Sequence, residues 1–162
     1  MPRAGFVGDE LGSSIIGSRL VRDIMNLCFL MEKRYAPYPK WFGTAYKRLS
    51  CAAEFELCLK QAATAQTWQE RELALSTAYE LLAKKHNRLG LTKLLPEHVS
   101  SFHDRPFKVI HGELFANALA ELINKDVFGD VIDTIRLIGN IDQISDNTDM
   151  RGNIILAKKK LM

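Results

Sequence analysis

A long apolar segment near the N-terminus, residues 8–43, limits the folds open to this chain more than any other feature. From Ile15 onward its apolar positions recur at helical spacing. Further apolar residues widen the stripe to almost every side, and a helix of that kind usually packs against neighbours on several faces. Pro37 disfavours helical geometry at Ala36, so the helix should end near Arg34. We therefore expect a long central helix, followed by an aromatic turn with two prolines.

The rest of the chain also favours helices, and no alternating strand pattern stands out. Thr67 and Glu70 fit a capping box, which predicts a helix that runs to Leu89 and ends at Gly90. Other helices are expected over residues 39–49, 51–65, 111–123, 127–134 and 152–162, with a loose lead-in at 1–8 and a long loop at 91–110. The prediction is a single all-α domain over residues 1–162, an irregular antiparallel helical bundle around the long central N-terminal helix.

Charge and cysteine content exclude several classes of protein. The net charge of +3 is too small to argue for a nucleic-acid partner. Three cysteines (Cys28, Cys51 and Cys58) without a CxxC pair favour free thiols in the reducing cytoplasm and no structural metal. The most apolar run, Leu27 to Met31, is far too short to span a membrane. We expect a cytoplasmic protein with no membrane contact.

Polar residues interrupt the apolar segment on one side. Offsets of three and four place these residues on one face of the helix: Arg19, Arg22, Asp23 and Asn26. One interpretation is an internal ion pair or a simple solvent-facing stripe, because charges on a central helix are costly unless paired. The other is a cleft wall that binds a nucleotide or phosphate, because guanidinium groups match phosphate oxygens.

The turn that follows, YAPYPKWFG, combines aromatic rings with a cation. Lys40 and Trp41 could bind a base or a sugar by stacking, as aromatic side chains do beside a cation. Such clusters also serve to hold a turn against the core. With the polar stripe, these two residues complete the predicted ligand-binding set.

Histidines and carboxylates elsewhere give weaker candidates. His86 could act as an acid or base in a small helical nuclease, although no arginine stands at the spacing that such enzymes use. His103 and Arg105 form a secondary candidate site, or a turn with a local ion pair beside Asp104. Three carboxylates near the C-terminus fit Asx turns and a helix cap better than a metal loop: Asp142, Asp146 and Asp149.

Several strings of this sequence resemble one family. LVRDIMNLCFLMEKRYAPYPKWFGTA, HDRPFKVI, FANAL and GNIDQISDNTD are similar, in this order, to the C-terminal region of the domain-of-unknown-function family number four-zero-three-seven. Its members resemble nucleotidyltransferases in their N-terminal half, where a Gly-Ser pair and carboxylates would bind Mg²⁺ and a nucleotide. The resemblance implies that this chain corresponds to the helical half without that catalytic half.

The resemblance implies a function as well. In isolation, the chain would be non-catalytic and bind no cofactor of its own; Mg²⁺ and a nucleotide would enter only with the N-terminal half. It would supply a substrate-binding or docking surface to a nucleotidyltransferase domain, encoded upstream in the same chain or separately. The alternatives are a stand-alone, toxin–antitoxin-like partner of a separate nucleotidyltransferase, or a nuclease that uses His86 or His103.

Overall fold

The computed structural model describes residues 1–126 of the 162. The chain divides into two compact units, Met1–Leu119 and Ala120–Met162, and the helix packing described below is that of the first. The predictions made for residues 127–134 and 152–162, and for the three C-terminal aspartates, lie outside the described residues. Within residues 1–126, no helix is both long and apolar enough to cross a lipid bilayer.

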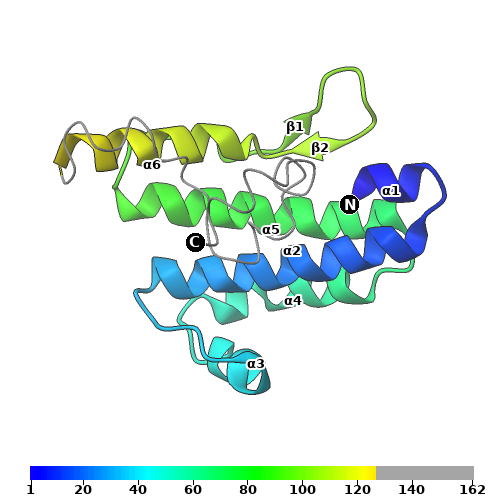
Figure 1. Cartoon of the computed structure of the whole chain (residues 1–162), viewed down its shortest axis with the longest axis horizontal. Coiled ribbons are helices and arrows are strands. Elements are labelled where there is room, and N and C mark those ends of the chain that lie inside the picture. The colour runs from blue at the N-terminus through cyan, green and yellow to red at the C-terminus, as the bar shows by residue number, and fades with distance from the viewer. Residues whose placement is uncertain (127–162) are drawn as a thin grey trace, which may run out of the picture. The chain divides into compact units, whose positions relative to one another are not determined.

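The described part of the chain is mostly helical, which confirms the predicted helical class (Figure 1). The helices are α1 (Pro2–Phe6), α2 (Glu10–Met31), α3 (Pro39–Tyr46), α4 (Ala52–Thr64), α5 (Trp68–Leu89) and α6 (Gly112–Asp126). A small antiparallel sheet pairs β1 (Ser100–Ser101) with β2 (Lys108–Val109).

Two segments differ from the prediction. The residues expected to form a loose lead-in form α1, which begins at Pro2, a residue suited to the first turn of a helix. The residues expected to form a long loop contain the two-stranded sheet. The all-α prediction is therefore wrong in this detail, because strands of two residues are too short to show the alternation by which a strand is found in sequence.

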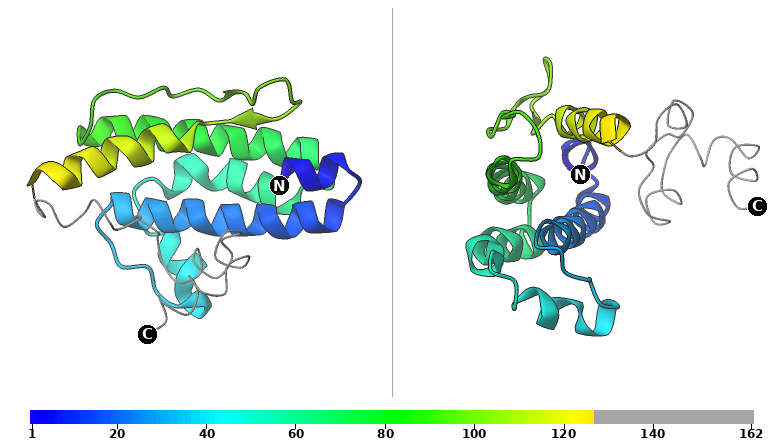
Figure 2. Two further views of the ribbon diagram at one scale, coloured as in Figure 1. Left: turned by 45° about the horizontal axis from the view of Figure 1, so that its top comes forward. Right: turned by 90° about the vertical axis from the view of Figure 1, so that its left-hand side faces the viewer.

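Three helices pack against one another: α2, α4 and α5 (Figures 1 and 2). The starts of α2 and α5 meet where a Glu10 carboxylate oxygen accepts from the Trp68 N–H at 2.9 Å. Near their other ends the Lys85 ammonium lies 3.3 Å from a carboxylate oxygen of Glu32. These two helices thus run in the same direction, unlike the predicted antiparallel arrangement, and α4 runs opposite to both. Helix α5 contacts α1, α2, α4 and β2.

Local sequence signals fix where the long helices begin and end. The Asp9 carboxylate accepts from the Gly12 N–H at 2.7 Å and caps α2. The capping box of Thr67 and Glu70 is present at the start of α5, which confirms that prediction. Gly90 follows α5 with a φ of 64°, a left-handed conformation in which glycine carries no steric penalty.

The core between these helices is apolar and contains all three cysteines. Its most deeply buried large side chains include Phe55 and Leu75. Cys28, Cys51 and Cys58 are free and buried, and burial raises the pKa of each thiol, to about 12 for Cys51. Thiols with raised pKa values stay protonated, so these three act as small apolar packing residues.

One buried cation joins α2, α5 and the turn between α4 and α5. Arg71 is only 2% exposed, and its guanidinium donates to the Ser13 hydroxyl and to the Ala65 carbonyl, each at 2.8 Å. A carboxylate oxygen of Glu10 lies 3.3 Å away and supplies the counter-charge. The side chain passes directly over Gly17, where a Cβ atom would come within 2.3 Å of the arginine Cδ. A buried charge is tolerated when paired and hydrogen-bonded in this way.

Replacing Gly17 by alanine should therefore destabilise the fold. We expect Gly17→Ala to lower the free energy of unfolding by roughly 2 kcal/mol, because overpacking outweighs the better helix propensity of alanine. Gly43→Ala is the matched control, since a Cβ atom there meets nothing within 4 Å. It should raise the free energy of unfolding by up to about 1 kcal/mol. Urea denaturation measures both, and equal stabilities would contradict the packing described for Arg71.

Candidate functional site

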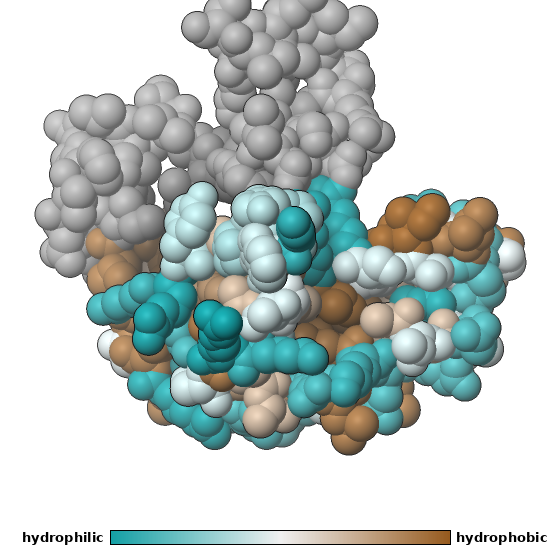
Figure 3. Space-filling view, turned by 90° about the horizontal axis from the view of Figure 1, so that it is seen from below, coloured by the Kyte–Doolittle hydropathy of each residue, from teal (hydrophilic) through white to brown (hydrophobic). Residues whose placement is uncertain are grey.

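The predicted polar stripe lies on the side of α2 that faces away from the core. The core side of the helix carries Ser13, Gly17, Ile24 and Cys28. The opposite side, which we name the outer face of α2, consists of Leu11, Ile15, Arg19, Arg22 and Asn26. Leu11 and Ile15 are 74% and 64% exposed, so this face joins exposed apolar side chains to the arginines. Figure 3 shows that hydrophobic and hydrophilic residues are intermixed over the side of the molecule that is seen from below.

Asp23 departs from the rest of the stripe. It is half-buried, as Arg19 is, but its charge lies close enough to Tyr79 of α5 to help raise the pKa of that phenol. Burial is the larger cause, and together with Asp23 and Glu72 it raises the pKa of Tyr79 to about 12. Asp23 is thus placed toward α5, whereas Arg22 is exposed on the outer face.

Lys40 and Trp41 lie in the first turn of α3, close to each other. The Lys40 ammonium is 5.4 Å from the centre of the Trp41 ring, within the range of a cation–π contact. Trp41 is 50% exposed, so part of its ring is open to solvent. The ring that packs inward from this region is Phe42, which contacts Phe29 of α2 at 5.5 Å between ring centres.

The secondary candidates, His103 and Arg105, lie in the turn between β1 and β2. Both are exposed, and both contact Phe102: the His103 ring at 4.7 Å and the Arg105 guanidinium at 5.8 Å from the centre of its ring. His103 has a φ of 53°, which is unusual outside glycine. This small cluster sits at an exposed tip, where Phe102 lines one of the two described cavities but neither His103 nor Arg105 does.

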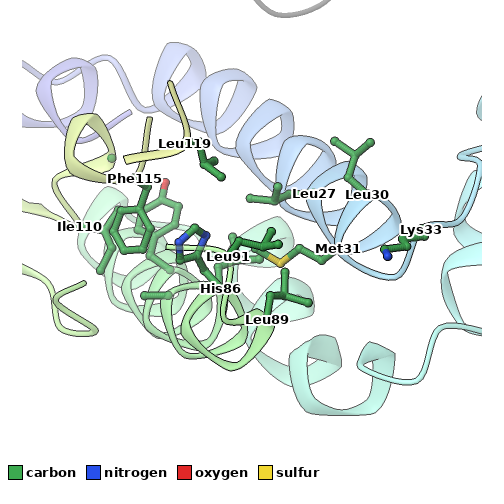
Figure 4. Close-up of a pocket in the computed structure, with 14 residues that line it drawn as sticks. Leu27, Leu30, Met31, Lys33, His86, Leu89, Leu91, Ile110, Phe115 and Leu119 are labelled. Atoms are coloured by element: carbon green, nitrogen blue, oxygen red, sulfur yellow. The ribbon is translucent and has the colours of Figure 1, made fainter. Parts of the chain in front are cut away.

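The largest described cavity is lined by other residues. It has a volume of about 560 Å³ and lies between the C-terminal half of α2, the C-terminal half of α5, and the segment from β2 into α6 (Figure 4). Its walls are mostly apolar: leucines are the commonest lining residues, and Met31, Ile110 and Phe115 are among the others. A second cavity of about 340 Å³ adjoins β2 and shares Tyr79, Ile110 and Gly112 with the first. Neither is lined by any predicted ligand-binding residue: Arg19, Arg22, Asp23, Asn26, Lys40, Trp41, His103 or Arg105.

His86 reaches the wall of the larger cavity. It is 5% exposed, its Nε2 atom lies 2.9 Å from the Thr92 hydroxyl, and Phe115 meets the ring edge-on at 5.1 Å. Burial lowers the pKa of His86, so the ring is neutral at pH 7. The imidazole is thus fixed by a neutral hydroxyl and an aromatic ring, which suits a packing role better than proton transfer. Within the described residues, no group of three or more His, Cys, Asp or Glu side chains is arranged to hold a metal ion.

Apart from His86, the residues that line the larger cavity were not singled out by sequence reasoning. Leu27, Leu82 and Leu89 follow the same helical spacing as true core residues, and Tyr79 and His86 lie on that same face of α5. A weak signal exists in Lys33, which follows the apolar helix α2 two residues after its last residue, Met31. Only the placement of residues 110–119 over α2 and α5 turns these positions into the wall of a cavity.

The described fold is thus a mostly helical domain with an apolar cavity and a partly exposed outer face on α2. A family model described as Domain of unknown function (DUF4037) matches residues 1–42, and this match is consistent with a member of that family. The family resemblance predicted from the sequence is confirmed over these residues, which include α1 and all of α2. The searches of curated proteins and of solved structures found no match.

Proposed function

We propose that this chain is the helical half of a nucleotidyltransferase-like protein, and that the outer face of α2 docks against the nucleotidyltransferase domain. The observation that carries the proposal is the exposure of Leu11 (74%) and Ile15 (64%) on the same face as Arg22. The family match includes this whole helix and supports the choice of surface.

Burial of this face would be favourable. Covering a leucine or isoleucine side chain contributes about 1.5–3 kcal/mol, and the outer face offers one of each in its first two turns. Arginine is among the residues enriched at protein interfaces, and its guanidinium group can form bidentate hydrogen bonds with carboxylates or phosphates. The pattern of apolar residues followed by arginines therefore suits a partner that offers an apolar patch beside an acidic or phosphate-bearing cleft.

The proposed partner supplies the chemistry. Mg²⁺ and the nucleotide belong to the nucleotidyltransferase domain, and this chain is non-catalytic by itself. Arg19, Arg22 and Asn26 would face that domain, and Lys40 with Trp41 would offer a cation and an aromatic surface to a nucleotide or phosphate at its edge. With its outer face covered, α2 would take the central place that its sequence predicts. The proposal locates the protein in the cytoplasm, where its three thiols stay reduced.

The same surface fits the second candidate, a stand-alone partner of a separately encoded, toxin–antitoxin-like nucleotidyltransferase. The two candidates differ in whether the partner lies in the same chain. The nuclease alternative gains no support from the contacts of His86, which joins the neutral hydroxyl of Thr92 and lies against Phe115.

Ile15→Glu should weaken the complex with the nucleotidyltransferase domain about tenfold or more, because it places a charge in an apolar contact. The partner to test is the domain encoded in frame upstream or by the neighbouring gene, mixed with this chain and followed by calorimetry. Leu73→Glu on α5 is the matched control, since that leucine is 66% exposed and lies off the outer face. The affinity of Leu73→Glu for the partner should stay within about twofold of that of the native chain. Absence of a complex, or equal losses in both variants, would contradict the proposal.

A further inference from the structure

We propose that the larger cavity binds an unbranched alkyl carboxylate, with the alkyl chain between α2, α5 and α6 and the carboxylate at Lys33. This inference is independent of the proposed docking face, because neither Leu11 nor Ile15 lines the cavity. Protein interiors rarely leave voids much larger than one water molecule. A volume of about 560 Å³ lies instead within the range of small-molecule sites.

The walls select an apolar ligand. The lining residues include six leucines, which come from α2, α5, α6 and the chain just after α5: Leu27, Leu30, Leu82, Leu89, Leu91 and Leu119. The two titratable rings that reach the cavity are neutral at pH 7: burial lowers the pKa of His86 and raises that of Tyr79. Hydrogen bonding between His86 and Thr92 already uses one ring nitrogen. Most of the surface can therefore contact only alkyl or aryl groups.

One cation marks one end of the cavity. Among the lining residues that the structure describes, Lys33 is the only lysine, and none is an arginine, aspartate or glutamate. Figure 4 shows Lys33 at one end, with His86, Ile110 and Phe115 at the other and leucines between them. An elongated apolar space with a single ammonium at one end is complementary to an alkyl chain with one anionic head. Lysine presents a compact point charge, which suits a carboxylate with its single negative charge.

The backbone at Lys33 supports a role for its side chain. Lys33 N–H donates to the Leu30 carbonyl and Arg34 N–H to the Phe29 carbonyl, the pattern that ends a helix in a Schellman motif. Lys33 itself takes a φ of 53°, at a position that glycine usually fills. A lysine there carries a steric cost that glycine avoids. Strain of this kind persists where the side chain has a use, and the cavity offers one.

Calorimetric titration with hexanoate, octanoate and decanoate tests the alkyl part of the proposal. Each added methylene should raise the affinity about threefold to fourfold, as expected for burial in an apolar wall. Gly112→Leu should weaken decanoate binding about tenfold or more by filling the cavity, because Gly112 lines it and a Cβ atom there meets nothing within 4 Å. Gly43→Leu, equally unhindered but outside the cavity, should leave the affinity unchanged. Lack of saturable binding, or equal effects of the two substitutions, would overturn the site.

Lys33→Gly tests the head group. It should weaken decanoate binding about fivefold or more while leaving 1-decanol binding unchanged, because only the carboxylate uses the ammonium. Its melting temperature should stay level or rise by up to about 3 °C, since glycine suits the left-handed position. If Lys33→Gly loses affinity for decanoate but no stability, the Lys33 side chain acts in ligand binding and not in folding. Equal affinity of the native protein for decanoate and 1-decanol, or decanoate binding unchanged in Lys33→Gly, would overturn the assignment of the carboxylate.

Discussion

Arg71→Met is expected to lower the free energy of unfolding by roughly 3 kcal/mol. The substitution keeps most of the apolar stem but removes the guanidinium that the Ser13 hydroxyl and the Ala65 carbonyl accept from. Ser13 is fully buried, so its hydroxyl would lose its donor without access to water. Glu10, partly exposed, would lose its counter-charge at less cost. Urea denaturation followed by circular dichroism measures the change.

Arg88→Met is the control for this substitution. The Arg88 side chain is 69% exposed, and a carboxylate oxygen of Glu54 lies 4.0 Å from its guanidinium. Exposed pairs of this kind contribute about 0–1 kcal/mol. A similar loss of stability in both variants would mean that Arg71 does not hold α2, α5 and the turn before α5 together.

Glu32→Gln is expected to lower the free energy of unfolding at neutral pH by about as much as Arg71→Met does. At acidic pH it should lower that free energy only slightly. Burial by itself would raise the pKa of Glu32, but hydrogen bonds from Cys51 and Ser50 outweigh it and lower the pKa to about 2. The carboxylate accepts from the Ser50 N–H at 3.0 Å, from the Ser50 hydroxyl at 2.8 Å and from the Cys51 N–H at 3.0 Å. Lys85 lies 3.3 Å from it. Glu32 thereby joins the end of α2 to the start of α4.

The expected pH dependence follows from the direction of that shift. A carboxyl group whose pKa is lower in the folded state stabilises the fold above its unfolded pKa. A fall from the ordinary 4.5 to about 2 corresponds to roughly 3 kcal/mol. This contribution should be lost as the pH falls from about 5 toward 2. The stability gap between the native protein and Glu32→Gln should therefore narrow over that window.

Glu56→Gln provides the comparison for the pH series. Glu56 lies 2.7 Å from Lys60 on the exposed side of α4, and this lysine lowers the pKa of Glu56. Solvent screens such a pair, so its loss should change the stability far less than the loss of Glu32. A gap for Glu32→Gln that stays constant between pH 5 and pH 2 would show that the carboxylate charge is not what stabilises this junction.

The parts of the fold that sequence predicts well are those fixed by local chemistry. The cap at Asp9, the capping box at Thr67 and the left-handed Gly90 each depend on residues within one turn of the chain. The helical class follows from periodicity in the same way. The direction of α2 relative to α5 depends instead on contacts between residues about 60 positions apart, such as Glu10 with Arg71, and no local pattern encodes it.

The candidate site was predicted only in part, for a related reason. The stripe of Arg19, Arg22 and Asn26 does share one face, because helical spacing alone decides that. Whether an apolar position belongs to the core or to a cavity wall depends on what covers it. Leu27 and Leu82 have the sequence environment of core residues, and only the course of residues 110–119 leaves space beside them. The role proposed for Lys33 depends on that same space.

The common direction of α2 and α5 has an electrostatic consequence. Parallel helices place the positive ends of their dipoles at one end of the pair and the negative ends at the other, an unfavourable arrangement unless charges offset it. Glu10 stands at the positive end: it lies in the first turn of α2 and also accepts from the first N–H of α5, at Trp68. Lys85 lies at the opposite end, near the close of α5 and beside Glu32. Glu10 thus adds to the caps that each helix has of its own, and the starts of α2 and α5 can lie side by side in the same direction.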